Sequence, residues 1–185
     1  MKETRVANRY AKALLELAIE LNVLEQVKAD ADLMSNVCKQ NRDFVLMLKS
    51  PVIKEYKKLS VIKEIFKGKL NELFLRFIVV ITRNHREELI PEISNQFITI
   101  YKKHKNILPA NLETSVKIDA ETREEIVTLL HNQTNAQIEL TEEVKEELIG
   151  GFIFSYEDKQ YDASILKRIK NLRKEFKHNL YIKGF

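Results

Sequence analysis

The chain has 185 residues, 44% of them hydrophobic, and a net charge of +4, which is enough for one medium-sized domain or two small ones. Its four glycines and three prolines are too few for a loop-rich or all-β protein, and its single cysteine, Cys38, excludes an internal disulfide. No apolar run reaches the ~20 residues that a membrane span needs, and the N-terminus lacks the features of a secretory signal, so we expect a soluble protein that meets a membrane only through a partner.

The first predicted helix covers residues 5–21, where apolar side chains recur at the spacing of one helical face. These are Val6, Tyr10, Leu14, Leu17 and Leu21. A second row consists of the small residues Ala7, Ala11 and Ala18, which would let another helix approach closely. The helix can therefore bury surface on two sides, and the sequence leaves open whether the second side faces its own domain or a partner.

Five further helices are predicted from the same periodicity, over residues 23–40, 43–49, 56–66, 70–82 and 88–105. The helix at 70–82 is apolar on most of its circumference, which predicts a central position. Because the connections are short, residues 1–106 are expected to form an all-α bundle of six helices.

The pattern changes after Pro109, which marks a predicted domain boundary. Alternating segments predict strands at 112–118, 136–140 and 152–156, with a turn at 157–159 and a return at 160–161. Asp119 and Asp162 are the expected N-caps of two helices, over 120–133 and 163–176. We therefore expect a mainly α protein, with a six-helix bundle at 1–106 followed by a small α+β domain at 107–185.

Charge is distributed unevenly along the chain. Residues 1–105 hold 20 basic and 13 acidic side chains, a net of +7, and residues 119–147 hold two basic and nine acidic ones, a net of −7. Residues 159–185 return to a net of +6, from eight basic and two acidic side chains. This alternation favours docking surfaces of opposite sign over a single stripe for nucleic acid.

The sequence offers little chemistry. Gly150 and Gly151 precede a predicted strand, whereas a phosphate cradle needs a strand, then glycines, then the start of a helix. The pair is better explained as backbone that must pass close to a neighbour. The four histidines show no metal-ligand spacing and Cys38 has no evident catalytic partner, so we expect no catalytic residue, no metal and no cofactor.

Several segments resemble the delta subunit of the F-type ATP synthase, called the oligomycin-sensitivity-conferring protein in mitochondria. The stretch VANRYAKALLELA resembles the opening of that family, with Arg9, Tyr10, Ala11 and Ala13 at matching positions. Ser50 and Pro51 match the corner between its third and fourth helices, and LIPEISNQF matches the start of its sixth. The strongest match is LIGGFIFSYEDKQYDASILKRIKNL, at Gly150, Gly151, Asp158, Lys159, Asp162, Ser164, Arg168 and Leu172. Glu157 and Ala163 depart from the family, which often has glycine at both positions.

The resemblance implies a non-catalytic stator subunit that links the catalytic head to the peripheral stalk and resists rotor torque. Its N-terminal bundle would receive N-terminal helices of the alpha subunits in a groove between the first and fifth helices. The residues implied for this groove are Val6, Tyr10, Ala13, Leu14, Leu17, Phe74, Phe77, Ile78 and Ile81. The sequence leaves open which of these belong to the core instead.

The resemblance also implies that the C-terminal domain holds the C-terminal end of the b subunit. The protein would then lie at the cytoplasmic side of the bacterial inner membrane, attached to it only through the complex, with no nucleic-acid partner. The alternative from the residues alone is a small helical RNA-binding factor, since the +7 of residues 1–105 permits a basic face. An enzyme is disfavoured for want of a catalytic constellation.

Overall fold

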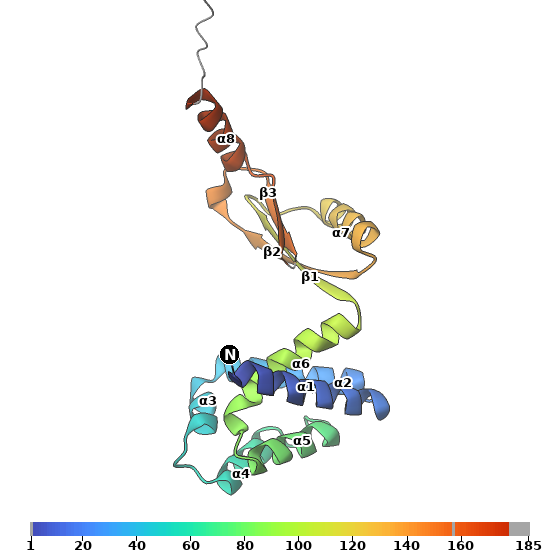
Figure 1. Cartoon of the computed structure of the whole chain (residues 1–185), viewed down its shortest axis with the longest axis vertical. Helices are drawn as coiled ribbons and strands as arrows, with labels where there is room; N and C mark the ends of the chain where they lie inside the picture. The colour runs from blue at the N-terminus through green and yellow to red at the C-terminus, as the bar shows by residue number, and fades with distance from the viewer. Residues whose placement is uncertain (1, 157, 178–185) are drawn as a thin grey trace, which may run out of the picture. The chain divides into compact units, whose positions relative to one another are not determined.

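The computed structural model describes residues 2–156 and 158–177 (Figure 1). The chain divides into two compact units, Met1–Lys105 and Asn106–Phe185, which are described separately below. The predicted turn residue Glu157 and the C-terminal tail after Lys177 lie outside the described residues. The prediction of a mainly helical chain with a small sheet is confirmed.

Among the described residues, the first unit consists of helices joined by short connections. They are α1 (Lys2–Glu20), α2 (Leu24–Gln40), α3 (Arg42–Lys49), α4 (Glu55–Ile65), α5 (Glu72–Arg83) and α6 (Ile90–His104), with the 3₁₀ turn η1 (Glu87–Leu89) before α6. The sixth helix was expected to begin at Glu88, but its first turn is this separate 3₁₀ turn. Pro91 has no N–H to bond the Glu87 carbonyl, so regular α-helical bonding cannot start that early.

The core of the first unit forms where α1 and α2 pack against α6. Ala7, Ala11 and Ala18 are fully buried, as is Phe97 of α6. The alanine row therefore serves the packing of this unit, because its small side chains let α6 approach α1 closely. Any partner of α1 must use the other side of the helix, which carries Tyr10.

The start of α5 is anchored to α2 by one residue, Asn71. Its side chain caps α5 by accepting the Leu73 N–H at 2.9 Å, and its own N–H donates to Asp30 Oδ2 at 2.8 Å. The side-chain Nδ2 of Asn71 also donates to Gln26 Oε1. Gln26 and Asp30 lie in the first half of α2, which begins just after α1 ends. The start of α5 is thereby held near the C-terminal end of α1, and the two helices run in opposite directions.

The second unit is a four-stranded sheet with two helices, within the described residues. Its elements are β1 (Ile107–Thr114), α7 (Ala120–Thr134), β2 (Gln137–Val144), the 3₁₀ turn η2 (Glu146–Leu148), β3 (Phe152–Tyr156), β4 (Lys159–Asp162) and α8 (Ile165–Lys177). The strand order is β2-β1-β3-β4, in which β1 is parallel to β2 and antiparallel to β3. Ala110, Leu112, Leu130 and Phe154 form the core between the sheet and α7.

The predicted first strand was wrong by several residues. It was placed at 112–118 and lies at Ile107–Thr114, so that Pro109 falls inside a strand and does not mark a boundary. Proline is tolerated there because β3 pairs with β1 only from Ala110 onward, which leaves one side of Pro109 without a neighbouring strand. The second strand was predicted to end at Leu140 but continues to Val144, paired with β1 along its whole length. Its additional residues, two of them acidic, lie exposed at the edge of the sheet.

The glycine pair before β3 allows a close approach of backbone, as predicted. Gly151 has a φ of +79°, and a Cβ at this position would collide with the carbonyl oxygen of Ala163. The Gly150 carbonyl accepts the N–H of Ile165 at 3.0 Å, so the start of α8 lies directly against the pair. The glycines therefore let the start of α8 pack directly against the backbone before β3.

The cap of α8 differs from the prediction in one detail. Asp162 Oδ1 accepts the Ser164 N–H at 2.9 Å, which was expected, but the helix begins at Ile165 and not at Ala163. The N-cap is Ser164, whose Oγ accepts the Lys167 N–H at 3.2 Å. Asp162 thus shapes the turn that leads into the capped helix.

The two units are joined by a connection of only two residues, Lys105 and Asn106, between α6 and β1. Lys105 Nζ lies 2.7 Å from Glu25 Oε1 in the first unit. Asn106 belongs to the second unit, where its Nδ2 donates to the Asn135 carbonyl at 2.8 Å and its own carbonyl accepts the Gln137 N–H at 3.0 Å. Each residue of the connection is therefore held by its own unit.

Candidate partner-docking surfaces

Aromatic side chains join α1 to α5. The ring of Tyr10 meets the ring of Phe77 edge-on, with centroids 6.3 Å apart, and Phe77 lies 6.5 Å from Phe74. The guanidinium of Arg86, in the loop after α5, lies 5.9 Å from the centre of the Tyr10 ring. Tyr10 and Phe77 are only half-buried, so the seam between the two helices retains accessible aromatic surface.

The nine residues predicted for the groove separate into two groups. Leu14, Phe74, Ile78 and Ile81 are at most 2% exposed, which places them in the core of the unit. Val6, Tyr10 and Phe77 are half-buried, whereas Ala13 and Leu17 are exposed. We define the α1/α5 face as Val6, Tyr10, Ala13, Leu17 and Phe77, together with the neighbouring Val80.

Sequence reasoning missed Val80, which is 52% exposed. It lies three residues after Phe77, so the two share one side of α5, and Leu17 of α1 is 44% exposed. The available signal was this spacing, but on a helix that is apolar nearly all round it does not distinguish core from surface. The face thus offers apolar side chains to solvent from both helices.

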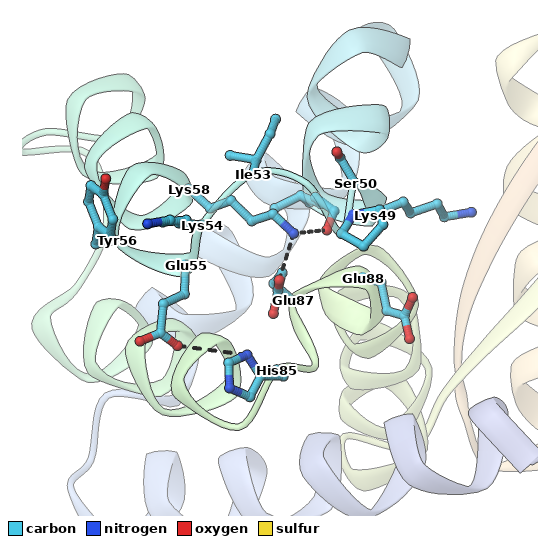
Figure 2. Close-up of a pocket in the computed structure, with 12 residues that line it drawn as sticks. Lys49, Ser50, Ile53, Lys54, Glu55, Tyr56, Lys58, His85, Glu87 and Glu88 are labelled. Carbon is cyan, nitrogen blue, oxygen red and sulfur yellow. Dashed lines mark hydrogen bonds and ion pairs between the residues drawn. The ribbon is translucent and has the colours of Figure 1, made fainter.

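Figure 2 shows a pocket of about 560 Å³ on the same unit, lined by the end of α3, the start of α4 and the loop after α5. Lys58 is 2% exposed; its Nζ donates to Glu87 Oε1 at 2.6 Å and to the Leu48 carbonyl at 2.8 Å. Lys58 thus donates to both acceptors, while Glu87 Oε2 is buried without a hydrogen-bond partner. The arrangement ties the end of α3, the helix α4 and the turn before α6 together.

Other reactive side chains are held in structural contacts. Cys38 is buried, and burial raises the pKa of its thiol to about 11, so that it stays protonated at neutral pH. His131 Nδ1 lies 2.8 Å from the Ala136 carbonyl, and His85 lies 3.8 Å from Glu55 at the surface. In residues 2–156 and 158–177, no group of three His, Cys, Asp or Glu side chains is placed to hold a metal ion.

A second apolar strip lies on α8, in the other unit. Ile165, Ile169 and Leu172 are 37% to 51% exposed and recur at the spacing of one helical face. Basic side chains flank them: Lys167, Arg168, Lys170, Arg173 and Lys174, all exposed. A pocket of about 520 Å³ runs along this helix, lined by Leu166, Lys170 and Arg173 of α8 and by Leu148 and Ile153. We call this surface the α8 strip.

Each unit therefore presents an apolar surface suited to receiving a helix, which is the arrangement expected of a helical adaptor. No helix among the described residues is long and apolar enough to cross a bilayer.

Comparison with known proteins identifies the family of this chain. The sequence model of the ATP synthase delta (OSCP) subunit matches residues 6–176. The chain is 32% identical over 176 residues to ATP synthase subunit delta of Cytophaga hutchinsonii, covering 95% of this chain and 96% of that protein. It is 35% identical over 182 residues to the same subunit of Christiangramia forsetii, covering 98% of each.

A solved structure gives the same result. The chain resembles one chain of the Toxoplasma gondii mitochondrial ATP synthase hexamer with a TM-score of 0.68 at 25% identity, covering 94% of this chain and 98% of that one. The protein belongs to the ATP synthase delta (OSCP) subunit family. It is a structural, non-catalytic and peripheral subunit of the ATP synthase assembly.

Proposed function

We propose that this protein is the stator link between the catalytic head of the ATP synthase and the b-subunit stalk. The observation that carries the proposal is the family match along both units, each of which also exposes an apolar helix surface. Rotation of the rotor exerts torque on the head, and ATP synthesis coupled to ion transport requires that the head be held still. A holder needs affinity and stiffness, and no chemistry.

In this proposal the six helices of the first unit act as one bundle that docks N-terminal helices of the alpha subunits. The α1/α5 face would be the binding surface for such a helix. The rings of Tyr10 and Phe77 would lie beneath it, and the exposed side chains of Leu17 and Val80 would contact it directly. An amphipathic helix laid along this seam would bury apolar area from both helices, at ~25 cal/mol per Å² before the costs of association.

The α8 strip is proposed as the seat for the C-terminal end of the b subunit. Ile165, Ile169 and Leu172 would contact apolar residues of the stalk, and the flanking lysines and arginines would favour an acidic segment beside them. Through these two contacts the protein would be held at the cytoplasmic side of the bacterial inner membrane, without touching the bilayer itself.

The test is a titration of the full chain with a peptide that copies the N-terminal helix of the alpha subunit from the same organism, at low and high salt. We expect saturable binding that survives salt, because apolar burial is screened little. Leu17→Asp should weaken it by about tenfold or more, since it places a charge in the seam. Ile19→Asp is the matched control, because Ile19 is on the same helix with a similar exposure of 39%, but lies about half a turn from Leu17, off the face.

Equal loss in both variants would show that the α1/α5 face is not the seat. Absence of any peptide binding, together with retention on RNA that is abolished by salt, would reject the stator assignment of this surface and favour the RNA-binding alternative.

A further inference from the structure

The α1/α5 face has charged side chains at both ends, and the two ends differ in sign. Arg9 on α1, Arg83 on α5 and Arg86 in the following loop are all exposed. Glu16 and Glu20, also exposed, lie further along α1. Among the described residues, none of these five side chains has an ion-pair partner, so their charges are available to a ligand.

The spacing of these residues places them along the edges of the face. Arg9, Glu16 and Glu20 follow one another at intervals of seven and four residues, which is one stripe of a helix, next to the stripe of Tyr10, Ala13 and Leu17. Arg9 and Glu16 are about 10 Å apart along the axis, at 1.5 Å per residue. The Debye length of the solution is about 8 Å at physiological salt, which is shorter than this separation, so a ligand meets the two ends as separate charges.

The antiparallel course of α5 puts Arg83 and Arg86 toward the Arg9 end of the face and not toward the glutamates. The start of α5 is bonded through Asn71 to α2, near the C-terminal end of α1. Its other end leads to Arg86, whose guanidinium lies over Tyr10 in the first half of α1. At the start of α5, Glu72 already pairs with Arg76 four residues on, so this pair adds no net charge to the acidic end.

We propose that this polarity selects the charge pattern and the direction of the docked helix. The ligand is an amphipathic helix with carboxylates at one end and basic residues at the other, and its acidic end lies over Arg9, Arg83 and Arg86. Helices commonly carry acids in their first turn and bases in their last, because these complement the helix dipole. Such a helix would lie parallel to α1 and antiparallel to α5.

This inference rests on the proposed function, since it presumes that the α1/α5 face receives a helix. It adds a specificity that apolar contact alone does not provide, because an apolar stripe accepts a helix in either direction. Charges at the edges of an interface set orientation and register more than affinity.

The test uses the full chain and two designed peptides with an identical stripe of leucine and alanine. One peptide has glutamates in its first two turns and lysines in its last two, and the other has these charges exchanged. Each has a nitroxide at its N-terminus, and the paramagnetic broadening of backbone amide signals in the protein reports which end of the face that terminus occupies. For the acid-first peptide we expect broadening around Arg9, and for the base-first peptide around Glu20.

A charge-exchanged variant, with Arg9→Glu, Arg83→Glu, Glu16→Lys and Glu20→Lys, should reverse both directions. Arg86 is left unchanged there because it contacts Tyr10. The control variant Lys39→Glu alters an exposed charge on α2, off the face, and should change neither. In 1 M salt, binding should persist while the preference for one direction falls by about tenfold.

The two ways of failing are distinct. If both peptides bind in the same direction, or without any preference, the polarity proposal is wrong while the docking face stands. If neither peptide binds and the alpha-subunit peptide does not bind either, the proposed function of the face is rejected.

Discussion

Lys58 and Glu87 form a buried ion pair across the first unit, with Nζ and Oε1 2.6 Å apart and residue exposures of 2% and 9%. Lys58 belongs to α4 and Glu87 to the turn before α6, and the Leu48 carbonyl at the end of α3 accepts a second bond from Lys58. One ammonium group thus bonds to two segments that lie 10 and 29 residues from Lys58 in the sequence.

Removing one partner of this pair is expected to destabilise the first unit strongly. Lys58→Met would leave the Glu87 carboxylate buried without a counter-charge, which costs about 3–5 kcal/mol in the free energy of unfolding. The double variant Lys58→Met with Glu87→Leu should recover most of that loss, because no charge remains buried. Urea unfolding of the three proteins measures this, and a double variant as unstable as the single one would contradict it.

Glycine at position 151 is expected to be far less replaceable than glycine at position 68. Both have positive φ, +79° and +69°, so alanine at either costs about 1–2 kcal/mol in backbone strain. Only at Gly151 would the added Cβ also collide with backbone, at Ala163, whereas Gly68 has no atom within 4 Å of such a Cβ. Thermal unfolding should show a clearly greater loss for Gly151→Ala, and equal losses would show that α8 does not lie against the pair.

Tyr101 is expected to ionise well above the usual pKa of a tyrosine. The hydroxyl of Tyr101 donates to Glu25 Oε2 at 2.6 Å, and this bond, with burial and the negative charge of Glu25, raises the pKa of Tyr101 to about 12. Because the folded pKa lies above the unfolded value, the stabilisation is complete below pH 10 and is lost as pH rises toward 12. Ultraviolet absorbance titration should reveal this late step.

The Glu25→Gln variant supplies the control for that titration. It removes the charge and weakens the bond, so the pKa of Tyr101 should fall toward 10. Tyr56→Phe, at a tyrosine that is 59% exposed, should leave the late step in place. A late step that persists unchanged in Glu25→Gln would refute the assignment.

Asp30 is expected to make the protein less stable as pH rises past its ordinary titration range. Burial raises the pKa of Asp30 above 3.8, an effect that the N–H of Asn71 only partly offsets. The native state therefore holds this proton more tightly than the unfolded chain does, and stability falls between pH 3.8 and the raised value. Asp30→Asn keeps an acceptor for Asn71 without the charge, so chemical denaturation at a series of pH values should show its relative stability increasing with pH.

The parts of the structure that depend on local pattern could be predicted from the sequence. The helices follow from the 3.6-residue periodicity, and the meaning of Gly150-Gly151 followed from their place before a strand, since a phosphate cradle needs the opposite order. Asp162 was correctly expected to accept the Ser164 N–H, because that bond spans two residues.

What the sequence could not provide depends on contacts between distant segments. Pro109 was misinterpreted because its tolerance in β1 depends on how far β3 pairs along β1. The last pair joins Ala110 to Tyr156, a residue far along the sequence, and leaves Pro109 unpaired on that side. Leu14 and Tyr10 share a helical stripe, yet Leu14 is fully buried and Tyr10 is not, since only the packing of neighbouring helices sets the edge of the core. Arg86 lies outside any helix and reaches Tyr10 only because the chain turns back after α5.

The two-residue connection between the units has a mechanical meaning. Fully extended, two residues span only about 7 Å, and here each is also bonded to its own unit, Lys105 to Glu25 and Asn106 to Asn135. A pull applied to either unit therefore reaches the other through the backbone with almost no slack to take up first. In the proposed stator function, this short connection would pass the strain of each rotary step from one unit to the other without first being extended.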